Sequence, residues 1–182
     1  MKVKKVNING LLVIEPKIFN DDRGYFFESF NSEKYGFITE KYNFVQDNIS
    51  KSKYGTIRGL HYQVGNSAQG KLISVLVGKV FDVAVDIRFG SPTFGKHFEI
   101  ELSDENKKQF WIPPGFAHGF SVLSEEVIFT YKCTELYNKD SERSIIYNDL
   151  ELNINWNVTK EIVSEKDLKA KKFSEIEKDF NY

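Results

Sequence analysis

The sequence predicts an all-β fold, an antiparallel sandwich or barrel of jelly-roll type with a short helical C-terminal tail. Short segments of alternating apolar and polar residues recur along most of the chain, with turn-forming residues between them. The 16 Phe and 9 Tyr residues suit strands better than a helical bundle. A helical pattern follows only from Ser164, which has Asp167 three residues later, as in a capping box.

Composition narrows the class of protein. With 182 residues, the chain is expected to form one domain over residues 1–182 with a substantial core. A net charge of −1 with 41% hydrophobic residues argues against disorder and against nucleic acid as a partner. Cys133 is the single cysteine, which rules out an internal disulfide. Neither a signal peptide nor a membrane-length apolar run is present, so we expect a cytoplasmic protein without a membrane partner.

Two strands are expected near the N-terminus. The first runs from Leu11 to Phe19, where Pro16 favours an edge position because proline cannot donate to a neighbouring strand. After an Asp-Asp turn, an aromatic strand follows over residues 25–30. Residues 31–41 have only weak helical character. The segment over 44–50 fits either a strand end that lines a polar cavity or an Asx turn.

Later strands are expected over the segments 57–64, 72–77, 80–88, 98–102 and 127–132. Gly78 and Lys79 predict a tight hairpin between two of them. In the strand after that turn, Asp82 and Asp86 share the face opposite the apolar one, and we expect both to pair with arginine. Asn155 and Trp156 close the β region.

The stretch from Arg58 to Lys71 is the strongest candidate for a site. It holds a guanidinium, an imidazole at His61, an amide at Gln63 and an ammonium at the ends of two extended apolar segments. His61 and Gln63 lie on one side of a strand, because side chains alternate faces with period two. Packing alone does not account for this set, which predicts a site for an anionic, oxygen-rich ligand.

A second candidate lies between Pro113 and Phe120. Two prolines and two glycines surround His118 and predict an imidazole held in one orientation. The Pro-x-Gly-x-x-His pattern resembles the second motif of the cupins, which are jelly rolls and often bind a metal through His-x-His and a glutamate. Here the corresponding place reads His61-Tyr62-Gln63, and His97 belongs to another strand. The sequence therefore predicts no metal and no other cofactor.

Longer stretches, in order along almost the whole chain, carry a more specific resemblance: Asp-Asp-Arg-Gly-Tyr-Phe-Phe-Glu (21–28), Val-Gln-Asp-Asn (45–48), Arg-Gly-Leu-His-Tyr-Gln (58–63), Gln-Gly-Lys-Leu (69–72), Phe-Asp-Val-Ala-Val-Asp-Ile-Arg (81–88), Ser-Pro-Thr-Phe-Gly (91–95), Gly-Phe-Ala-His-Gly-Phe (115–120), Tyr-Lys (131–132) and Ser-Glu-Lys-Asp (164–167). Together they resemble the dTDP-4-dehydrorhamnose 3,5-epimerases, metal-independent enzymes of cupin fold. Two departures, Asn138-Lys139 in place of a proline-containing turn and Tyr147 in place of tryptophan, bear on base or sugar preference rather than on the chemistry.

The resemblance implies an isomerase of dTDP-rhamnose biosynthesis that inverts C3 and C5 of dTDP-4-dehydro-6-deoxy-D-glucose to give dTDP-4-dehydro-L-rhamnose. Hydrogens on both carbons are alpha to the C4 carbonyl, so their removal gives an enolate, which must be reprotonated from the opposite face. By resemblance His61 is the base, Tyr131 the acid and Lys71 the cation at the enolate oxygen. Asp167 has two candidate roles, as the carboxylate that fixes the His61 tautomer or as a helix cap, and the first is favoured.

The resemblance also implies the residues that hold the substrate. Arg23, Arg58 and Lys166 are the expected pyrophosphate ligands, because cationic side chains, guanidinium forks above all, suit phosphate oxygens. Tyr137 is expected to stack on the nucleotide base. The other implied contacts to sugar or base are Glu28, Gln46, Asp47, Asn48, His118 and Glu142.

The expected partner besides the nucleotide-sugar substrate is a second copy of the chain. By resemblance the protein is a homodimer in which the aromatic strand over 25–30 crosses to the neighbour. Three alternatives remain: a related mono-epimerase or 3,4-ketoisomerase, a metal-dependent cupin enzyme, and a sugar-binding module without activity. The last is disfavoured, because a binder needs no base paired with an acid.

Overall fold

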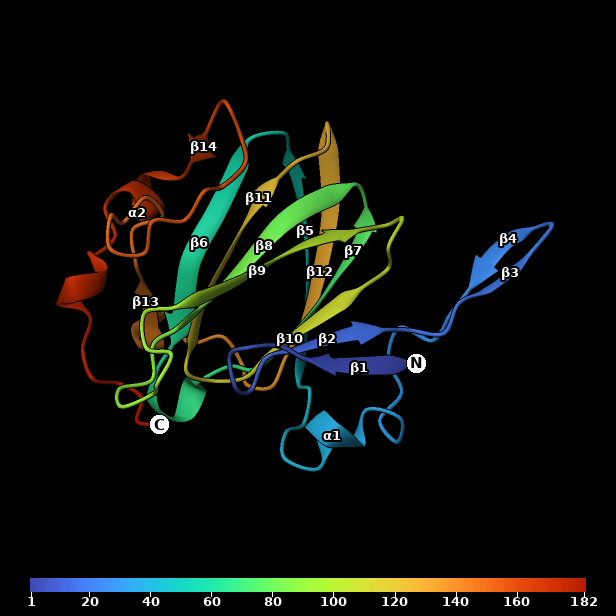
Figure 1. Ribbon diagram of the computed structural model, residues 1–182, viewed down its shortest axis with the longest axis horizontal. Helices are drawn as coiled ribbons and strands as arrows, with labels where there is room; N and C mark the ends of the chain where they lie inside the picture. Colours follow the sequence, from blue (N-terminus) through green and yellow to red (C-terminus); the bar gives the residue numbers. More distant parts are fainter.

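The computed structural model describes residues 1–182 as two packed β-sheets with short helices at their margins (Figure 1). The strands are β1 (Lys2–Lys5), β2 (Leu12–Glu15), β3 (Phe19–Asp21), β4 (Gly24–Phe26), β5 (Gln46–Lys53), β6 (Thr56–Gln63), β7 (Lys71–Val77), β8 (Lys79–Asp86), β9 (His97–Ser103), β10 (Gln109–Ile112), β11 (Phe116–Val122), β12 (Glu126–Cys133), β13 (Glu142–Ser144) and β14 (Ile162–Val163). The helices are α1 (Gly36–Thr39) and α2 (Glu165–Leu168). The predicted all-β class with a short helical tail is confirmed.

Each sheet is largely antiparallel. The first sheet has the order β1-β2-β10-β7-β12-β5, and the second has the order β13-β6-β11-β8-β9. Strand β14 joins the second sheet by pairing in parallel with β6. The β3–β4 hairpin belongs to neither sheet and extends away from the body of the molecule (Figure 1).

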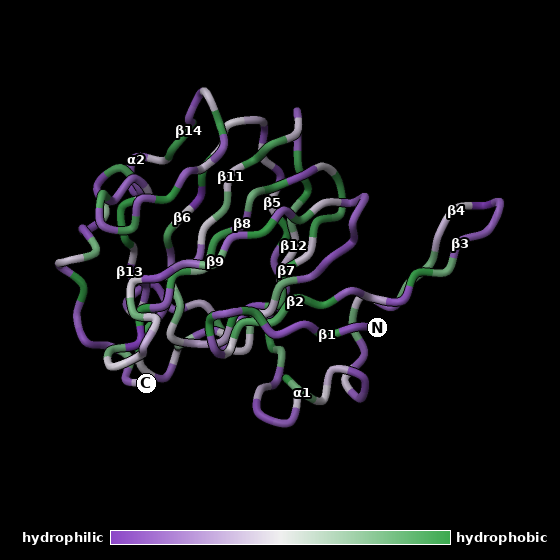
Figure 2. Tube along the Cα trace, viewed as in Figure 1, coloured by the Kyte–Doolittle hydropathy of each residue, from purple (hydrophilic) through white to green (hydrophobic).

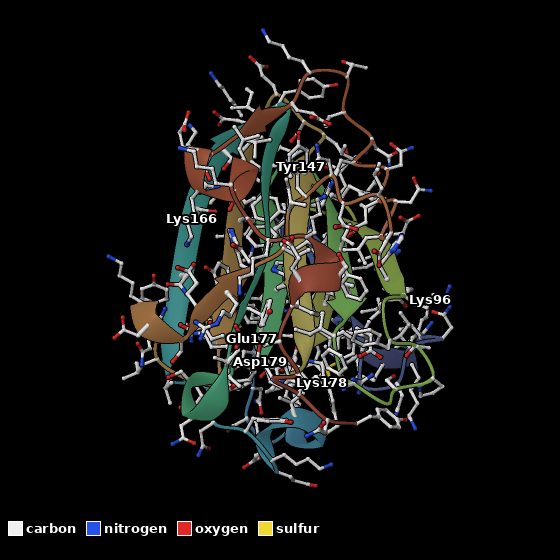
Figure 3. The ribbon with its side chains drawn as sticks, turned by 90° about the vertical axis from the view of Figure 1, so that its left-hand side faces the viewer. Lys96, Tyr147, Lys166, Glu177, Lys178 and Asp179 are labelled. Atoms are coloured by element: carbon white, nitrogen blue, oxygen red, sulfur yellow. The ribbon has the colours of Figure 1, made fainter.

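Apolar residues gather in three layers. The interior of the sandwich takes Val75 and Phe129 from the first sheet and Ala84 and Phe120 from the second. A second cluster covers the outer face of the second sheet beneath the C-terminal segment, which Figure 3 views face on, and it includes Trp156. A third lies under the α1 region on the outer face of the first sheet. Figure 2 shows the same division, with apolar stretches along the strands and hydrophilic ones at many turns.

Two expectations about strand connections are wrong. Strands β7 and β8 do not form a hairpin, because they lie in different sheets. Gly78, with φ of +81°, turns the chain from one sheet to the other, and a Cβ there would meet the Glu126 carbonyl oxygen at 2.1 Å. Pro16 does not mark an edge strand, because it follows the end of β2, which pairs with β1 on one side and β10 on the other.

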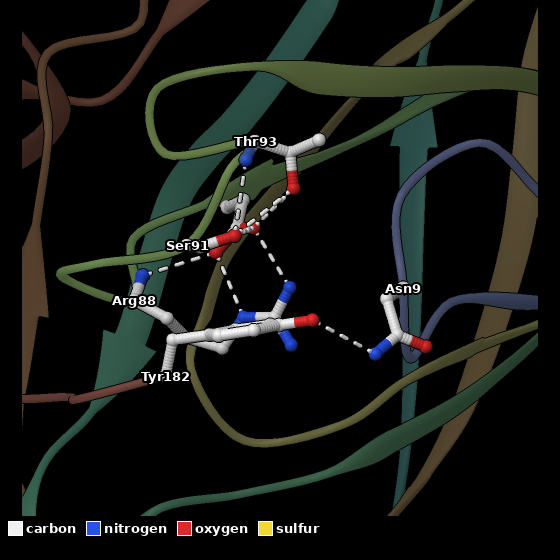
Figure 4. Close-up of polar contacts among 6 residues, drawn as sticks. Asn9, Arg88, Ser91, Thr93 and Tyr182 are labelled. Atoms are coloured by element: carbon white, nitrogen blue, oxygen red, sulfur yellow. Dashed lines mark hydrogen bonds and ion pairs between the residues drawn. The ribbon is translucent and has the colours of Figure 1, made fainter.

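Strand β8 has the predicted alternation, but its two acids differ. Asp86 accepts hydrogen bonds from Arg88 Nε at 2.8 Å and Nη2 at 2.7 Å, as expected. The Arg88 guanidinium lies 4.5 Å from the Phe116 ring centroid and 5.0 Å from that of Tyr182, so it fastens the C-terminus to the body (Figure 4). Asp82 contacts no arginine, and that part of the prediction is wrong.

None of the helices is both long and apolar enough to span a bilayer.

Candidate active site

Polar side chains replace the apolar core at one end of the sandwich interior. On β12, Tyr131 follows Phe129 on the inward face and still packs against the apolar cluster. On β5, alternate residues are more buried, which settles the two readings of this segment in favour of a strand with a polar inner face. The inward polar residues there are Gln46, Asn48, Lys71, Tyr131 and Cys133 from the first sheet, and His61, Gln63, Asp82 and His118 from the second, whereas the exposed Arg58 lies farther along β6 beside Ser52.

His61 and Asp167 form the pair that the resemblance implies. His61 Nε2 lies 2.6 Å from Asp167 Oδ1, and the carboxylate is almost fully buried. The Asp167 backbone N–H donates to the Ser164 hydroxyl at 3.1 Å, so the residue also belongs to the helix cap. The carboxylate therefore takes the His61 contact, while only the backbone N–H takes part in the cap, without the reciprocal bond from the Ser164 N–H that a capping box requires. Burial opposes ionisation, but the hydrogen bond from His61 holds the pKa of Asp167 below its usual value.

His118 is held by a second carboxylate. Its Nε2 lies 3.0 Å from both oxygens of Asp82, and both side chains are buried. Burial lowers the pKa of His118, and the Asp82 carboxylate opposes that shift. The predicted fixed orientation thus comes from Asp82 rather than only from the local prolines and glycines. In the sequence, the one signal for this contact is the position of Asp82 on β8: it lies on the face opposite the apolar one, two residues before the small inward residue Ala84.

Lys71 faces these groups from the first sheet without an ion pair of its own. Burial lowers the pKa of Lys71, and Cys133, Asp82 and Glu142 act in the opposite direction. Its Nζ lies 6.0 Å from the centroid of the Tyr131 ring. Burial also raises the pKa of the Tyr131 phenol. The interior therefore holds a lysine whose charged form is disfavoured by burial, close to a phenol that stays protonated.

A cleft of about 1060 Å³ opens beside His61, and its lining includes four cationic side chains and three carboxylates: Lys51, Lys53, Arg58, Lys166, Glu125, Glu126 and Asp167. Arg58 lies in it with Nε donating to the Ser52 hydroxyl at 3.1 Å. Lys166 lies at its margin and pairs with Glu142 Oε2 at 2.5 Å. Anionic groups of a ligand that enters here meet positive charge close to the imidazole.

Tyr137 and Glu142 lie together beyond Lys166. The Tyr137 hydroxyl donates to Glu142 Oε2 at 3.0 Å, while the tyrosine remains 54% exposed. Burial opposes the shift, but hydrogen bonds from Lys166 and Tyr137 lower the pKa of Glu142. These residues put a flat aromatic surface and a carboxylate near the basic cleft.

Two amide side chains on the inner face of β5 are hydrogen-bonded to each other at the start of the strand. Gln46 Nε2 donates to Asn48 Oδ1 at 3.0 Å, and Asn48 Nδ2 lies 3.6 Å from Cys133 Sγ. Burial raises the pKa of this free thiol. Gln46 and Asn48 therefore join the candidate site, as the resemblance implies.

Three of the implied contacts are not brought to this interior. Arg23 lies at the tip of the β3–β4 hairpin, where Nη2 pairs with Asp21 at 2.6 Å. Glu28 pairs with Lys34 in the segment after that hairpin. Asp47 points to the opposite face of β5 from Gln46 and Asn48, as the alternation of side chains along a strand requires. Its carboxylate lies 2.9 Å from Lys132 Nζ.

The residues do not assemble a metal site. No group of three or more His, Cys, Asp or Glu side chains is arranged to hold an ion. Gln63, at the place of a cupin ligand, uses both ends of its amide on backbone groups of neighbouring loops.

Comparisons with known proteins agree on the family. A family model described as dTDP-4-dehydrorhamnose 3,5-epimerase matches residues 5–175. The chain is 53% identical to an enzyme of that name from Shigella flexneri over 95% of this chain and 96% of the relative.

Solved structures extend the similarity. A dTDP-6-deoxy-D-glucose-3,5-epimerase from Legionella pneumophila in complex with dTDP-4-keto-L-rhamnose superimposes with a TM-score of 0.95, at 50% identity over 100% of this chain and 98% of that one. A 3'-monoepimerase from Streptomyces bikiniensis in complex with dTDP-quinovose reaches 0.87, at 28% identity over 93% and 86%. This chain belongs to the dTDP-4-dehydrorhamnose 3,5-epimerase family.

Proposed function

We propose that the protein inverts C3 and C5 of dTDP-4-dehydro-6-deoxy-D-glucose by proton transfer through an enolate. The family supports the reaction class, and the relative from Legionella, in complex with a dTDP-linked keto sugar, supports the substrate class. The single observation that carries the mechanism is the His61–Asp167 hydrogen bond of 2.6 Å at the edge of a basic cleft.

His61 is the proposed base. An ionised carboxylate can only accept a hydrogen bond, so Asp167 fixes the proton of the neutral imidazole on Nε2. Nδ1 then carries the free lone pair and takes the proton from C3 or C5. Asp167 stabilises the imidazolium that results, in the manner of a triad aspartate.

Lys71 is the proposed partner of the enolate oxygen. Removal of the proton leaves negative charge on the C4 oxygen, and a cation in a desolvated site stabilises that charge more strongly than one in water. Since Lys71 has no carboxylate partner of its own, its ammonium is available to the substrate.

Tyr131 is the proposed acid. It stands on the first sheet, whereas His61 stands on the second, so the sugar ring would lie between a base on one face and an acid on the other. Burial raises the pKa of Tyr131 and keeps the phenol protonated until it delivers its proton to the enolate carbon.

The nucleotide part of the substrate is assigned to the basic margin of the site. Arg58 and Lys166 would bind the pyrophosphate, and Tyr137 would stack on the base. The cytoplasmic location expected from the sequence is part of the same proposal.

The proposal includes a homodimer. On the β3–β4 hairpin, Phe19, Tyr25 and Phe26 are 50%, 55% and 66% exposed, although Lys17 lies over the Phe19 ring and Lys107 over the Tyr25 ring, so the hairpin presents aromatic surface to the solvent. A second copy would cover that surface, and the same exchange would carry Arg23 and Glu28 into the neighbour's site.

Deuterium uptake tests the reaction. With dTDP-4-dehydro-6-deoxy-D-glucose in D₂O, NMR should show deuterium and inversion at both C3 and C5. Exchange at C3 alone would instead support a mono-epimerase like the relative from Streptomyces bikiniensis, and a carbonyl that moves to C3 would support a ketoisomerase. Turnover should persist after exhaustive chelation, since the proposed chemistry uses only side chains. Activity that is lost on chelation and restored by a divalent ion would contradict this.

A further inference from the structure

Gln63 is a buried polar residue that the proposed chemistry does not use. It is 5% exposed and follows His61 by two residues on β6. Its amide contacts no substrate-binding side chain. A buried amide has to be satisfied by hydrogen bonds, so its partners indicate what it is for.

All of its partners are backbone groups of two loops. Gln63 Oε1 accepts a hydrogen bond from the Asn138 N–H at 2.7 Å, and Nε2 donates to the carbonyls of Ser67 at 2.7 Å and Leu136 at 3.3 Å. Two of these three bonds fall on the residues immediately before and after Tyr137. The amide is therefore hydrogen-bonded to the Tyr137 loop, residues 134–138, on both sides of the tyrosine.

A second glutamine holds the same loop from the other sheet. The Tyr137 N–H donates to Gln46 Oε1 at 2.8 Å, and Gln46 belongs to β5 of the first sheet. Consecutive N–H groups, those of Tyr137 and Asn138, are thus received by one glutamine from each sheet. The loop backbone is therefore held between the two sheets by these two hydrogen bonds.

The Tyr137 side chain itself has little else to hold it. It is 54% exposed and belongs to none of the apolar clusters, so its position depends on the loop backbone and on the hydroxyl bond to Glu142. Holding a binding residue in its bound conformation before the ligand arrives increases affinity, because less conformational freedom is lost on binding.

We propose that Gln63 is a positioning residue that fixes Tyr137 for contact with the nucleotide base. The inference rests on the proposed function, in which Tyr137 meets that base. Gln63 stands where many cupins have a metal ligand, and in this proposal its amide contributes to nucleotide affinity rather than to metal binding or proton transfer.

Gln63→Met tests this, since methionine has a similar length and neither donates nor accepts strongly. The Kd for dTDP, measured by calorimetry, should rise about tenfold, a loss comparable to one net hydrogen bond. The Kd for inorganic pyrophosphate, which has no base, should change less than about twofold if the effect runs through Tyr137. In turnover, KM should rise while kcat stays within about threefold, because His61 and Lys71 keep their places.

Gln69→Met is the matched control. Gln69 Nε2 also donates to this loop, at the Glu135 carbonyl at 2.7 Å, but that bond is exposed and water can replace it. The control should leave both dissociation constants unchanged. If Gln63→Met lowers the melting temperature too far for binding studies, Gln63→Asn takes its place, because it keeps an uncharged amide but is one methylene too short to reach the loop groups.

Combination with Tyr137→Ala separates the possible failures. Tyr137→Ala alone should weaken dTDP binding, and adding Gln63→Met to it should then have little further effect. If Tyr137→Ala weakens binding but Gln63→Met does not, or if Gln63→Met weakens pyrophosphate equally, the positioning role is wrong and the proposed function stands. If Tyr137→Ala leaves dTDP binding intact, the proposed base contact fails and takes this inference with it.

Discussion

The His61 imidazole and the Asp167 carboxylate lie 2.6 Å apart although 106 residues separate them in the chain. The contact forms because β14 pairs in parallel with the start of β6, Ile162 opposite Thr56, and so carries α2 alongside the strand that bears His61. The C-terminal tail therefore completes the candidate active site and does not only cover the second sheet.

Asp167→Asn should give a folded protein with turnover reduced about 10²–10⁴-fold. The amide keeps the size of the side chain and the helix cap, which uses the backbone N–H, but it no longer stabilises the Nε2–H tautomer or the imidazolium. Steady-state kinetics with circular dichroism measures both properties. Glu165→Gln, on the same helix with an 85% exposed side chain, is the control and should retain activity. An Asp167→Asn protein within about threefold of wild type would remove Asp167 from the mechanism.

Lys71→Met should stabilise the fold while it impairs turnover. Burial lowers the pKa of Lys71, which means that the ammonium form costs folding free energy at neutral pH. Removing it should raise the free energy of unfolding by about 1 kcal/mol and lower kcat about 10²–10³-fold. Urea denaturation and kinetics give the two values. The exposed Lys96 provides the control, since Lys96→Met should change neither. A Lys71→Met protein that is less stable and fully active would contradict both roles.

The strands were accessible from the sequence because each rests on a local or strongly patterned signal. The predicted strand over 57–64 corresponds to Thr56–Gln63, and that over 127–132 to Glu126–Cys133. Alternation also fixes which side chains share a face, so His61 and Gln63 point the same way. The resemblance then supplied Asp167, which no local pattern links to β6.

The predictions that were wrong concern features that depend on contacts between the two sheets. Gly78 has the local signature of a hairpin, but only the packing of the two sheets decides that β7 and β8 part there. Asp82 and Asp86 are equivalent in sequence, and their different partners follow from their depth: Asp86 reaches Arg88 near a strand end, whereas Asp82 meets His118 inside the sandwich. The hydrogen bonds of Gln63 to the two loops could not be predicted either, because they also depend on how distant parts of the chain pack together.

Acidification should destabilise the protein through His118. Burial lowers the pKa of His118 in the folded state, so below the unfolded value of about 6.5 the unfolded chain binds the proton first, and stability falls as the pH falls. Between about pH 7.5 and pH 5.5 this group should cost wild type about 1 kcal/mol. Urea denaturation of His118→Gln should show a correspondingly smaller loss. The lowered pKa of Asp167 acts in a separate window, below about pH 4. Equal pH dependence in both proteins would show that His118 is not the group responsible.

Phe26→Glu should convert a dimer into a monomer. Phe26 is 66% exposed on the projecting hairpin, and a charge there could not be buried against a second copy. Light scattering at micromolar concentration should give the dimer mass for wild type. Leu150→Glu, at a position 93% exposed on the body, should remain dimeric. A monomeric wild type would rule out the proposed exchange of Arg23 and Glu28.

Separate removal of His61 and Tyr131 tests the assignment of base and acid. His61→Ala should abolish deuterium uptake from D₂O at both C3 and C5, because no enolate forms. Tyr131→Phe keeps the ring and its packing but deletes the hydroxyl, so the base can still remove a proton and return a deuteron from its own face. Exchange with retention should therefore outlast inversion in that variant, since exchange needs a group on one face of the sugar and inversion needs groups on two.

NMR of the recovered substrate and product distinguishes these outcomes, because it reports deuterium content and configuration at each carbon separately. Tyr147→Phe is the matched control: it deletes a hydroxyl that donates to Glu161 at 2.6 Å on the far side of the second sheet, away from the sandwich interior. It should invert both carbons as wild type does. A Tyr131→Phe protein that does the same would show that the second proton comes from another group, and a His61→Ala protein that still exchanges both hydrogens would show that the base lies elsewhere.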